Sequence, residues 1–570
     1  ALDSLVEGEQ GYTFDLGNNL GTNFTVLGLE TGQYRIEGSV LTIEGEAISS
    51  VTWVSAGEGG ELEETVKNAF TLALGEGRAA NVSLGYLNGT LTTSGDKVYQ
   101  ITNTGETKIN LSGVYNSGAT LPSGNLNYQG DIWMDINGGA FGIIAGGVTN
   151  EWSTKLQTST LTGDTHVQLS GDATAEHVIG GNNKGASTTL TGNTNVTVKD
   201  NAIVAGAIIG GSTSAHNAVT TITGNTSVLV TNVQYSNTAQ NLDGGLSNSY
   251  IIGGSSWSSN TTSGTTIQGS TSATINLNGI TLSGTEEHNS FVKTIIGGSY
   301  GNVNNAGTVN NINGDTSVSI IGREGITFTG DIIGGSFENS GQAQYTIGGN
   351  SSISISGGST FTGNIYGGSY SKVPGNTGST MTTAGNITVE LGTGTYRGNI
   401  YGAGNKGTAG GDVLVSLTGG SVFGAEGEQS GITIGGSAGA AVEGNRTLEL
   451  KGTFGDADFQ YASFTQFDKI DVTGEGSSAT IYSLTESARL EKTGAGRLTL
   501  GANAAGAETI LGGITEGISI TEGSLNLSGA GGSHMKGDWS IASGSRLTGV
   551  SGTVTVGGEN GLDSLSIALG

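Results

Sequence analysis

Hydrophobic and polar residues alternate in short stretches that recur along the middle of the chain. Each stretch follows a Gly-Asn-Thr, Gly-Asp-Thr or similar cue and places an apolar residue at every second position, as in Val196-Thr197-Val198. Alternation with this period predicts a strand that buries one of its faces. Clear copies occupy residues 163–169, 192–198, 224–230, 314–320 and 349–355.

A second recurring element is an apolar pair that is followed by a Gly-Gly or similar corner. It returns nine times, at a spacing of 30 to 44 residues. A repeat of this length, with one strand and one corner, is typical of a solenoid whose stacked units bury one continuous core. The pairs are Ile143-Ile144, Val178-Ile179, Ile208-Ile209, Ile251-Ile252, Ile295-Ile296, Ile332-Ile333, Ile365-Tyr366, Ile400-Tyr401 and Thr433-Ile434.

One compact repeat, which begins at Ile332 and leads into Ile365, displays the whole unit. Residues 332–335, 344–347 and 351–356 are expected to form three strands separated by Gly corners. Three strands per turn predict one coil of a parallel β-helix, and glycine supplies the positive φ angles that sharp corners need. Nine coils at a spacing of about 4.8 Å would form a rod of about 40 Å.

The two members of each apolar pair are expected to face opposite ways. The first members (Ile208, Ile251, Ile295, Ile332, Ile365 and Ile400) should form an inward ladder. The second members (Ile209, Ile252, Ile296, Ile333, Tyr366 and Tyr401) should then point outward. The tyrosines among them indicate that this outer ladder is half covered, by the loops that follow each pair.

The ends of the chain lack this pattern, and we expect three parts. Residues 1–135 form a distinct, mainly-β region that caps the solenoid or stands apart from it. Within it, residues 61–74 carry acidic residues followed by an imperfect apolar stripe, which predicts one helix. Residues 136–440 form the repeat solenoid, and residues 441–570 form a second type of solenoid. The fold class is therefore all-β, a parallel β-helix.

The composition narrows the functional classes. The chain has 105 Gly, only 2 Pro, no Cys and a net charge of −27. Such a charge argues against nucleic acid and against an anionic membrane surface as partners. Without cysteine, stability must come from stacking rather than disulfides. No apolar run is long enough for a membrane helix. We expect Ala1 to be a mature terminus, and the chain to be a processed or truncated piece of something longer.

Candidate chemistry is sparse. Carbohydrate-active β-helix enzymes need clustered carboxylates in a groove, but residues 201–285 contain a single charged residue, Asp243. The richest polar cluster has two interpretations: a metal or acid–base site, or ordinary surface residues. The second is favoured, because the spacing matches no compact ligand motif. We therefore assign no catalytic, metal or cofactor residue. The cluster comprises Asp164, His166, Asp172, Glu176 and His177.

Two further features have competing interpretations. Glu286-Glu287-His288 lies in a long insertion, which is either a functional loop or, as we favour, a charged tip that keeps the insertion soluble. Four aromatic residues follow Gly-Gly corners, where they would either stack against sugars or, as we favour, clamp their own loops onto the coil. These residues are Trp257, Tyr300, Phe337 and Tyr370.

The segment after about residue 440 resembles the passenger domains of bacterial autotransporters. The resemblance lies in residues 490–500 (Leu-Glu-Lys-Thr-Gly-Ala-Gly-Arg-Leu-Thr-Leu) and 518–527 (Ile-Ser-Ile-Thr-Glu-Gly-Ser-Leu-Asn-Leu). These stretches are similar to the autotransporter-associated β-strand repeat, and residues 464–472 fit the usual approach to it. The resemblance implies a right-handed β-helix outside a Gram-negative-type cell. The outer-membrane barrel of that family is missing from this sequence.

These observations predict a non-enzymatic, secreted or surface-displayed β-solenoid that acts as an adhesin or a stalk. Its edge loops would contact host or matrix glycans or proteins through many weak interactions. One alternative is a self-assembling filament or matrix subunit, and another is a carbohydrate-active β-helix enzyme. No cofactor, nucleic acid or direct membrane insertion is expected.

Overall fold

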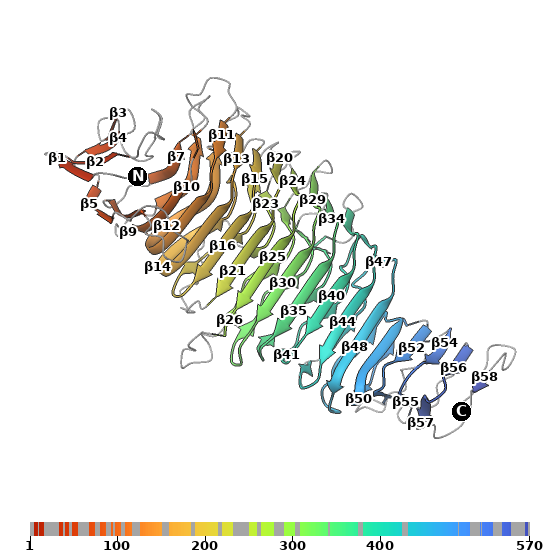
Figure 1. Ribbon diagram of the computed structural model, residues 1–570. Coiled ribbons are helices and arrows are strands. Elements are labelled where there is room, and N and C mark those ends of the chain that lie inside the picture. The colour runs from red at the N-terminus through yellow and green to blue at the C-terminus, as the bar shows by residue number, and fades with distance from the viewer. Residues whose placement is uncertain are drawn as a thin grey trace.

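The described residues form a long stack of parallel strands, and they contain no helix (Figure 1). This confirms an all-β parallel β-helix. The computed structural model describes residues 110–113, 128–149, 160–183, 188–214, 219–231, 250–256, 264–278, 291–301, 308–339, 343–373, 380–424, 431–487, 489–501, 514, 516–527 and 539–548. Outside these ranges only the backbone of some strands, bends and turns is described. Among the described residues, no helix is long and apolar enough to cross a membrane.

The four coils from β22 to β41 each contain five short strands rather than the three that the sequence predicts. The two additional strands are only two or three residues long and follow corners, so no periodic pattern marks them in the sequence. One coil runs through β32 (Ile332–Ile333), β33 (Phe337–Glu338), β34 (Gln344–Ile347), β35 (Ser351–Ser356) and β36 (Thr360–Phe361) before it returns as β37 (Ile365–Tyr366).

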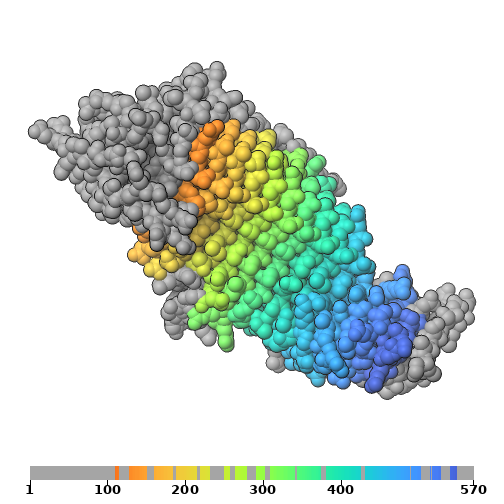
Figure 2. Space-filling model, in the orientation of Figure 1, coloured from red at the N-terminus to blue at the C-terminus, as the bar shows by residue number. Residues whose placement is uncertain are grey.

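The strands of this coil pair in parallel with their counterparts in the next coil, so the coils stack in register. The apolar-pair strands are β18 (Ile208–Ile209), β22 (Tyr250–Ile252), β27 (Thr294–Ile296), β32, β37, β42 (Ile400–Tyr401), β46 (Ile432–Gly435), β49 (Ala462–Thr465) and β51 (Leu484–Thr485). The strands in which buried and solvent-facing residues alternate lie side by side on the face that is turned to the viewer in Figures 1 and 2, which we call the front face. They are β14 (Thr165–Ile179), β16 (Thr194–Lys199), β21 (Thr226–Thr231), β25 (Thr271–Asn276), β30 (Thr316–Ile321), β35, β40 (Ile387–Leu391), β44 (Val413–Thr418), β48 (Arg446–Thr453) and β50 (Lys469–Ile481).

Three further sheets complete the coil. The longest has eleven strands, namely β8 (Thr93–Ser94), β11 (Leu126–Gln129), β13 (Ser159–Thr162), β15 (Thr188–Thr191), β20 (Val219–Ile222), β24 (Gly264–Ile267), β29 (Val309–Ile312), β34, β39 (Thr380–Thr383), β43 (Thr408–Ala409) and β47 (Ala441–Val442). Two five-stranded sheets fill the corners. They comprise β19 (Thr213–Ser214), β23 (Ser256–Ser258), β28 (Tyr300–Asn302), β33 and β38 (Tyr370–Ser371), and β26 (Ser290–Phe291), β31 (Thr327–Phe328), β36, β41 (Thr395–Tyr396) and β45 (Val422–Phe423).

The N-terminal strands combine antiparallel and parallel pairing. A four-stranded antiparallel sheet comes first, and β5 pairs antiparallel with β6, whereas β6, β7, β9, β10 and β12 make parallel pairs. The strands are β1 (Leu5–Gly8), β2 (Gly11–Asp15), β3 (Tyr34–Glu37), β4 (Val40–Glu44), β5 (Ile48–Val54), β6 (Asn68–Leu74), β7 (Ala80–Tyr86), β9 (Lys97–Asn103), β10 (Ile109–Asn116) and β12 (Ile132–Asn150).

The helix predicted for residues 61–74 is wrong over its second half, which is β6 (Asn68–Leu74). Phe70, Leu72 and Leu74 recur at every second residue, which is the period of a strand. Pairing with β5 on one side and β9 on the other then outweighs the helix preference of the segment. The first half of the prediction, residues 61–67, lies outside the described residues.

The two ladders of the apolar pairs face opposite ways, as predicted. The inner ladder lies in the main core, where Ile251, Ile295 and Ile400 are completely buried. The outer ladder forms a second apolar cluster with Tyr300 and Phe337. This outer ladder is covered more completely than expected, because Ile252, Ile296 and Ile333 are all 0 % exposed. Burial of each such side chain stabilises the fold by about 2 kcal/mol.

A stack of aromatic rings runs through the interior along the solenoid axis. Neighbouring ring centroids lie 4.9 to 5.2 Å apart. Because coils repeat at about 4.8 Å, one ring per coil gives continuous stacking contact. The members are Phe291, Phe328, Phe361, Tyr396, Phe423 and Phe459.

The Gly-Gly corners bring the backbones of neighbouring coils together. A Cβ atom on Gly297 would lie 2.4 Å from the carbonyl oxygen of Gly334 in the next coil. No side chain fits at that distance, so the corner requires glycine because of close approach rather than because of an unusual φ angle.

The solenoid becomes narrower towards its C-terminal end (Figure 1). Ile332 pairs with Ile365 in the wide part, a coil of 33 residues, whereas Ile470 pairs with Lys492 in the narrow part, a coil of 22 residues. The eleven-stranded sheet ends at β47. The narrow coils contain β52 (Arg489–Thr493), β53 (Arg497–Leu500), β54 (Gly517–Ile520), β55 (Ser524–Asn526), β56 (Asp538–Ile541), β57 (Arg546–Thr548) and β58 (Leu565–Ile567).

Candidate functional surface

A ladder of side-chain hydrogen bonds joins ten successive coils along one corner. In each step, an Asn, Asp or Ser side-chain oxygen accepts a hydrogen bond from the backbone N–H of the equivalent residue in the next coil. The donor–acceptor distances are 2.7 to 3.0 Å. The members are Asp131, Asp164, Asn193, Asn225, Ser270, Asp315, Asn350, Asn386, Asp412 and Asn445, which we call the Asx ladder.

Two residues of the polar cluster, Asp164 and His166, contact residues of neighbouring coils. Asp164 belongs to the Asx ladder, where its Oδ1 accepts the Asn193 N–H. The His166 ring stacks on Trp133 with centroids 3.4 Å apart, and Asn195 Nδ2 lies 3.2 Å from His166 Nδ1. Burial lowers the pKa of His166, although Asp164 and Asp131 oppose this shift. His166 is thus half-buried between coils.

The other three members lie further along β14 and do not join His166 in one site. Gly171, at φ 57°, forms a corner between the two halves of this strand. Beyond it, Asp172 accepts a hydrogen bond from Asn201, and His177 Nδ1 accepts the Ala207 N–H at 3.0 Å. Glu176 lies on the same half of the strand, next to His177.

Within the described ranges, no group of three or more His, Cys, Asp or Glu side chains could hold a metal ion. Four of the five cluster residues contact neighbouring coils through the five contacts given above, and the interpretation of the cluster as ordinary surface residues stays a prediction. Residues 286–288 and Asp243 lie outside the described residues, and so does the side chain of Trp257.

The remaining aromatic candidates are packed against their own coil. Tyr300 and Phe337 are each only 7 % exposed, and their ring centroids lie 5.5 Å apart. Tyr370 stacks on Phe337 at 5.7 Å and on Tyr366 at 4.2 Å. Burial raises the pKa of Tyr366, with a further contribution from Tyr370. Rings in this arrangement clamp the outer ladder of the solenoid, with Tyr300 and Phe337 buried and Tyr370 half-buried.

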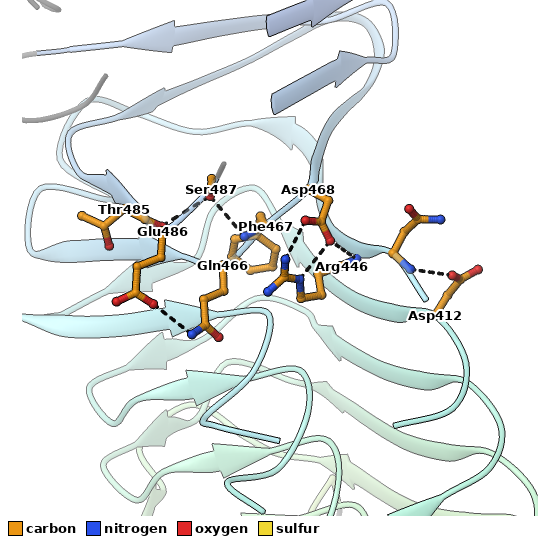
Figure 3. A network of polar contacts seen from close by, with 9 residues as sticks. Asp412, Arg446, Gln466, Phe467, Asp468, Thr485, Glu486 and Ser487 are labelled. Carbon is orange, nitrogen blue, oxygen red and sulfur yellow. Dashed lines mark hydrogen bonds and ion pairs between the residues drawn. The ribbon is translucent and has the colours of Figure 1, made fainter. Parts of the chain in front are cut away.

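A bidentate ion pair marks the junction between the wide and narrow coils (Figure 3). Arg446 Nε donates to Asp468 Oδ2 at 2.9 Å and Nη2 donates to Oδ1 at 2.6 Å. The Arg446 backbone N–H also donates to Oδ2. Burial alone would raise the pKa of Asp468, but the hydrogen bonds and charge of Arg446 lower it. Arg446 is in register with Val413 and Ile387 in the two preceding coils, and with Ser351 and Thr316 in the two coils before those.

The same junction contains two residues in the left-handed region. Gln466 and Glu486 have φ angles of 59° and 54°, and they follow paired strands at one corner of successive coils. Their side chains are joined by a hydrogen bond from Gln466 Nε2 to Glu486 Oε2 of 2.9 Å (Figure 3). Phe467 N–H donates to Ser487 Oγ beside them. Contacts within the protein hold this unusual corner.

Two lysine side chains are directed at backbone carbonyl groups. Lys492 is completely buried, and its Nζ donates to the carbonyl oxygens of Thr493, Gly494 and Glu522. Lys293 Nζ donates to two carbonyl oxygens that lie 87 and 88 residues earlier. Burial lowers the pKa of each lysine to about 8. Both contacts tie separate parts of the coil stack together.

Two sheet faces of the described coils differ in the charge that they carry. The front face carries solvent-facing Glu390 and Glu449, and Asp135 on the adjoining β12 is in register with Gln168 of β14. Lys451 lies 3.1 Å from Glu449 and 3.8 Å from Glu390, so part of this charge is paired. The eleven-stranded sheet carries no charged residue in any of its strands.

Comparison with known proteins gives no relative. No family model matches the chain, and no curated protein or solved structure matches it. The resemblance of residues 490–500 and 518–527 to autotransporter repeats therefore stays a prediction. Lys492, within that motif, has a structural role that is visible here independently of any family.

Proposed function

We propose that this chain is a non-enzymatic β-solenoid, secreted or displayed at a bacterial surface, that acts as an adhesin or a stalk. The Asx ladder is the observation that carries the proposal. Its nine consecutive links, from Asp131 to Asn445, span about 43 Å at 4.8 Å per coil. A hydrogen-bonded column of this length resists bending and separation of the coils.

The way in which polar side chains are used also supports a structural role. Asp164, His166 and His177 all contact neighbouring coils, as do Lys492 and the ion pair at the junction. An enzyme of this fold needs carboxylates that are free to face a substrate. In this solenoid, Asp164 and Asp468 are held by contacts between coils, and the solvent-facing Glu390 and Glu449 of the front face both lie near Lys451.

Binding would then depend on many weak contacts along the rod. A rigid rod holds its edge segments at fixed spacing, so that successive contacts with one partner become intramolecular and their affinities combine. The partners proposed are host or matrix glycans and proteins. The extracellular location comes from the resemblance of the C-terminal segment and belongs to the proposal.

The test is an adhesion assay with beads that carry the purified chain at controlled density. Beads should bind a restricted set of glycans or matrix proteins, and binding should fall steeply as bead density is lowered, because it is multivalent. Beads with heat-unfolded chain are the control. Cleavage of any bound polysaccharide, measured as new reducing ends, would contradict the proposal and favour an enzyme.

A further inference from the structure

The solvent side of the eleven-stranded sheet carries a row of eight residues in register, seven of which are threonine. Cα pairing aligns them one by one through seven successive steps, and none of these pairings contains a register shift. All of them are half-buried or exposed. The row, which we call the threonine row, consists of Thr160, Thr189, Thr221, Thr266, Asn311, Thr346, Thr382 and Thr408, so that a single asparagine interrupts it.

A second row lies two residues further along each coil, at the last residue of β13 and β15 and one residue beyond the ends of β20, β24 and β29. Three coils repeat threonine there, which gives Thr-x-Thr in successive coils, and the next two coils have amide side chains. Four members of this row are exposed, and the fifth, Thr223, is half-buried. The row consists of Thr162, Thr191, Thr223, Gln268 and Asn313.

Together the rows form a two-dimensional lattice of hydrogen-bonding groups. Neighbours along a row are separated by the coil spacing, about 4.8 Å, and neighbours across the rows by two residues of strand, roughly 6.6 Å. These repeats are close to the spacings between water oxygens on the prism face of hexagonal ice. Each threonine presents a hydroxyl that bonds water and a methyl group that limits its orientation.

The strands that carry the threonine row have no charged residues, unlike the strands of the front face. Threonine is favoured on exposed strands, so that a threonine row alone would be ordinary. The chain, however, has a net charge of −27, and the front face carries solvent-facing Glu390 and Glu449. None of the eleven strands behind the threonine row has a charged residue. Charged groups bind water in a radial shell that is incompatible with a flat crystal lattice.

The same features disfavour a glycan as the ligand of this face. Sugar sites combine a concave surface with aromatic platforms. The aromatic residues of this sheet, Tyr128 and Tyr345, are each 1 % exposed and belong to the interior. Hydrogen bonds from threonine hydroxyls to a soluble glycan would only replace their bonds to water, with a small net gain.

We infer that the threonine row and its neighbouring row bind the surface of ice crystals. Each contact with lattice water is weak, but the coil stack holds the row in register at a fixed spacing, so that their effects add. This activity is independent of the adhesin or stalk role, because it needs only the sheet face and no edge segment.

The experiment measures ice-crystal shape and thermal hysteresis in a solution of the full-length chain, cooled in a nanolitre osmometer. The expected results are faceted crystals and a gap between melting and growth temperatures. Thr221→Tyr, which places a bulky ring in the centre of the row, should abolish both. Thr266→Tyr is a second disrupting variant, in case one variant fails to fold.

Thr274→Tyr provides the matched control. Thr274 is also half-buried and solvent-facing, but it lies on β25 of the front face, so its replacement should leave hysteresis unchanged. Far-UV circular dichroism verifies that each variant is folded. Round crystals with the unmodified chain would overturn the inference, and so would equal losses for Thr221→Tyr and Thr274→Tyr. The inference would also be overturned if the chain bound a glycan, Thr221→Tyr abolished that binding, and neither protein changed the growth of ice.

Discussion

Replacement of Phe361 by alanine tests the aromatic stack that runs along the interior. Phe361 is 1 % exposed, and its ring lies between Phe328 at 4.9 Å and Tyr396 at 5.2 Å. A buried Phe→Ala change destabilises a protein by about 3–5 kcal/mol. Within that loss, each of the two ring contacts contributes about 0.5–1.5 kcal/mol. Phe361→Leu, which keeps much of the volume but no ring, should lose about 1–2 kcal/mol.

Hydrogen exchange followed by mass spectrometry is the suitable assay, because stacked repeats open locally and each coil contacts only its neighbours. The free energy of local opening should fall in the coils that contain β31, β36 and β41, and little elsewhere. Ser354→Ala, an exposed position in the same coil, should change stability by less than about 0.5 kcal/mol. A loss for Phe361→Ala no larger than that of Ser354→Ala would refute the stacked arrangement.

Four other predictions concern the corners, the Asx ladder, the junction and a buried lysine. Gly297→Ala puts a Cβ 2.4 Å from a carbonyl oxygen of the next coil, and we expect it to lower the urea midpoint by the equivalent of about 2 kcal/mol; an unchanged midpoint would show that the coils are further apart. Asn193→Ala removes one acceptor of the ladder and should cost about 1 kcal/mol in the same urea titration. Asn193→Asp keeps the acceptor but should also destabilise the fold, because its carboxylate replaces an amide that donates to the Asp164 carboxylate. In a double-mutant cycle of Arg446→Ala and Asp468→Ala, the coupling energy should be about 1–2 kcal/mol because the pair is partly exposed, and additive losses would mean that the pair does not form. Burial lowers the pKa of Lys492 from 10.5 to about 8, so the unfolded chain binds more protons than the folded chain between these pH values. The free energy of unfolding should therefore rise with pH across this window, and Lys492→Met should flatten that part of the stability profile. An identical profile in the variant would contradict the burial of the amine.

The sequence predicts the stacking axis well, because every coil repeats the same local signals. Ile-Ile before a glycine corner has one inward and one outward member, and the ladders of Ile208 and Ile209 behave in this way. The two-residue strands at the corners were not predicted. A strand as short as Thr360–Phe361 has no periodicity of its own and exists only because the neighbouring coils pair with it.

The environment of His166 illustrates what a repeat pattern leaves open. Its outward position follows from alternation, but its stacking on Trp133 depends on the register between coils, which the linear sequence does not determine. One signal was present: residues 130–136 begin with Gly-Asp and alternate like residues 163–169, which aligns Trp133 with His166. The threonine row becomes visible only with the register, because insertions place its members 26 to 45 residues apart.

Negative-stain electron microscopy of the purified chain, at rising concentration and with or without Ca²⁺, tests the central claim most directly. The account predicts separate short rods at every concentration, since the ladders and stacks act within one chain. Ordered fibres or sheets that grow with concentration would contradict it and identify the chain as a self-assembling structural subunit.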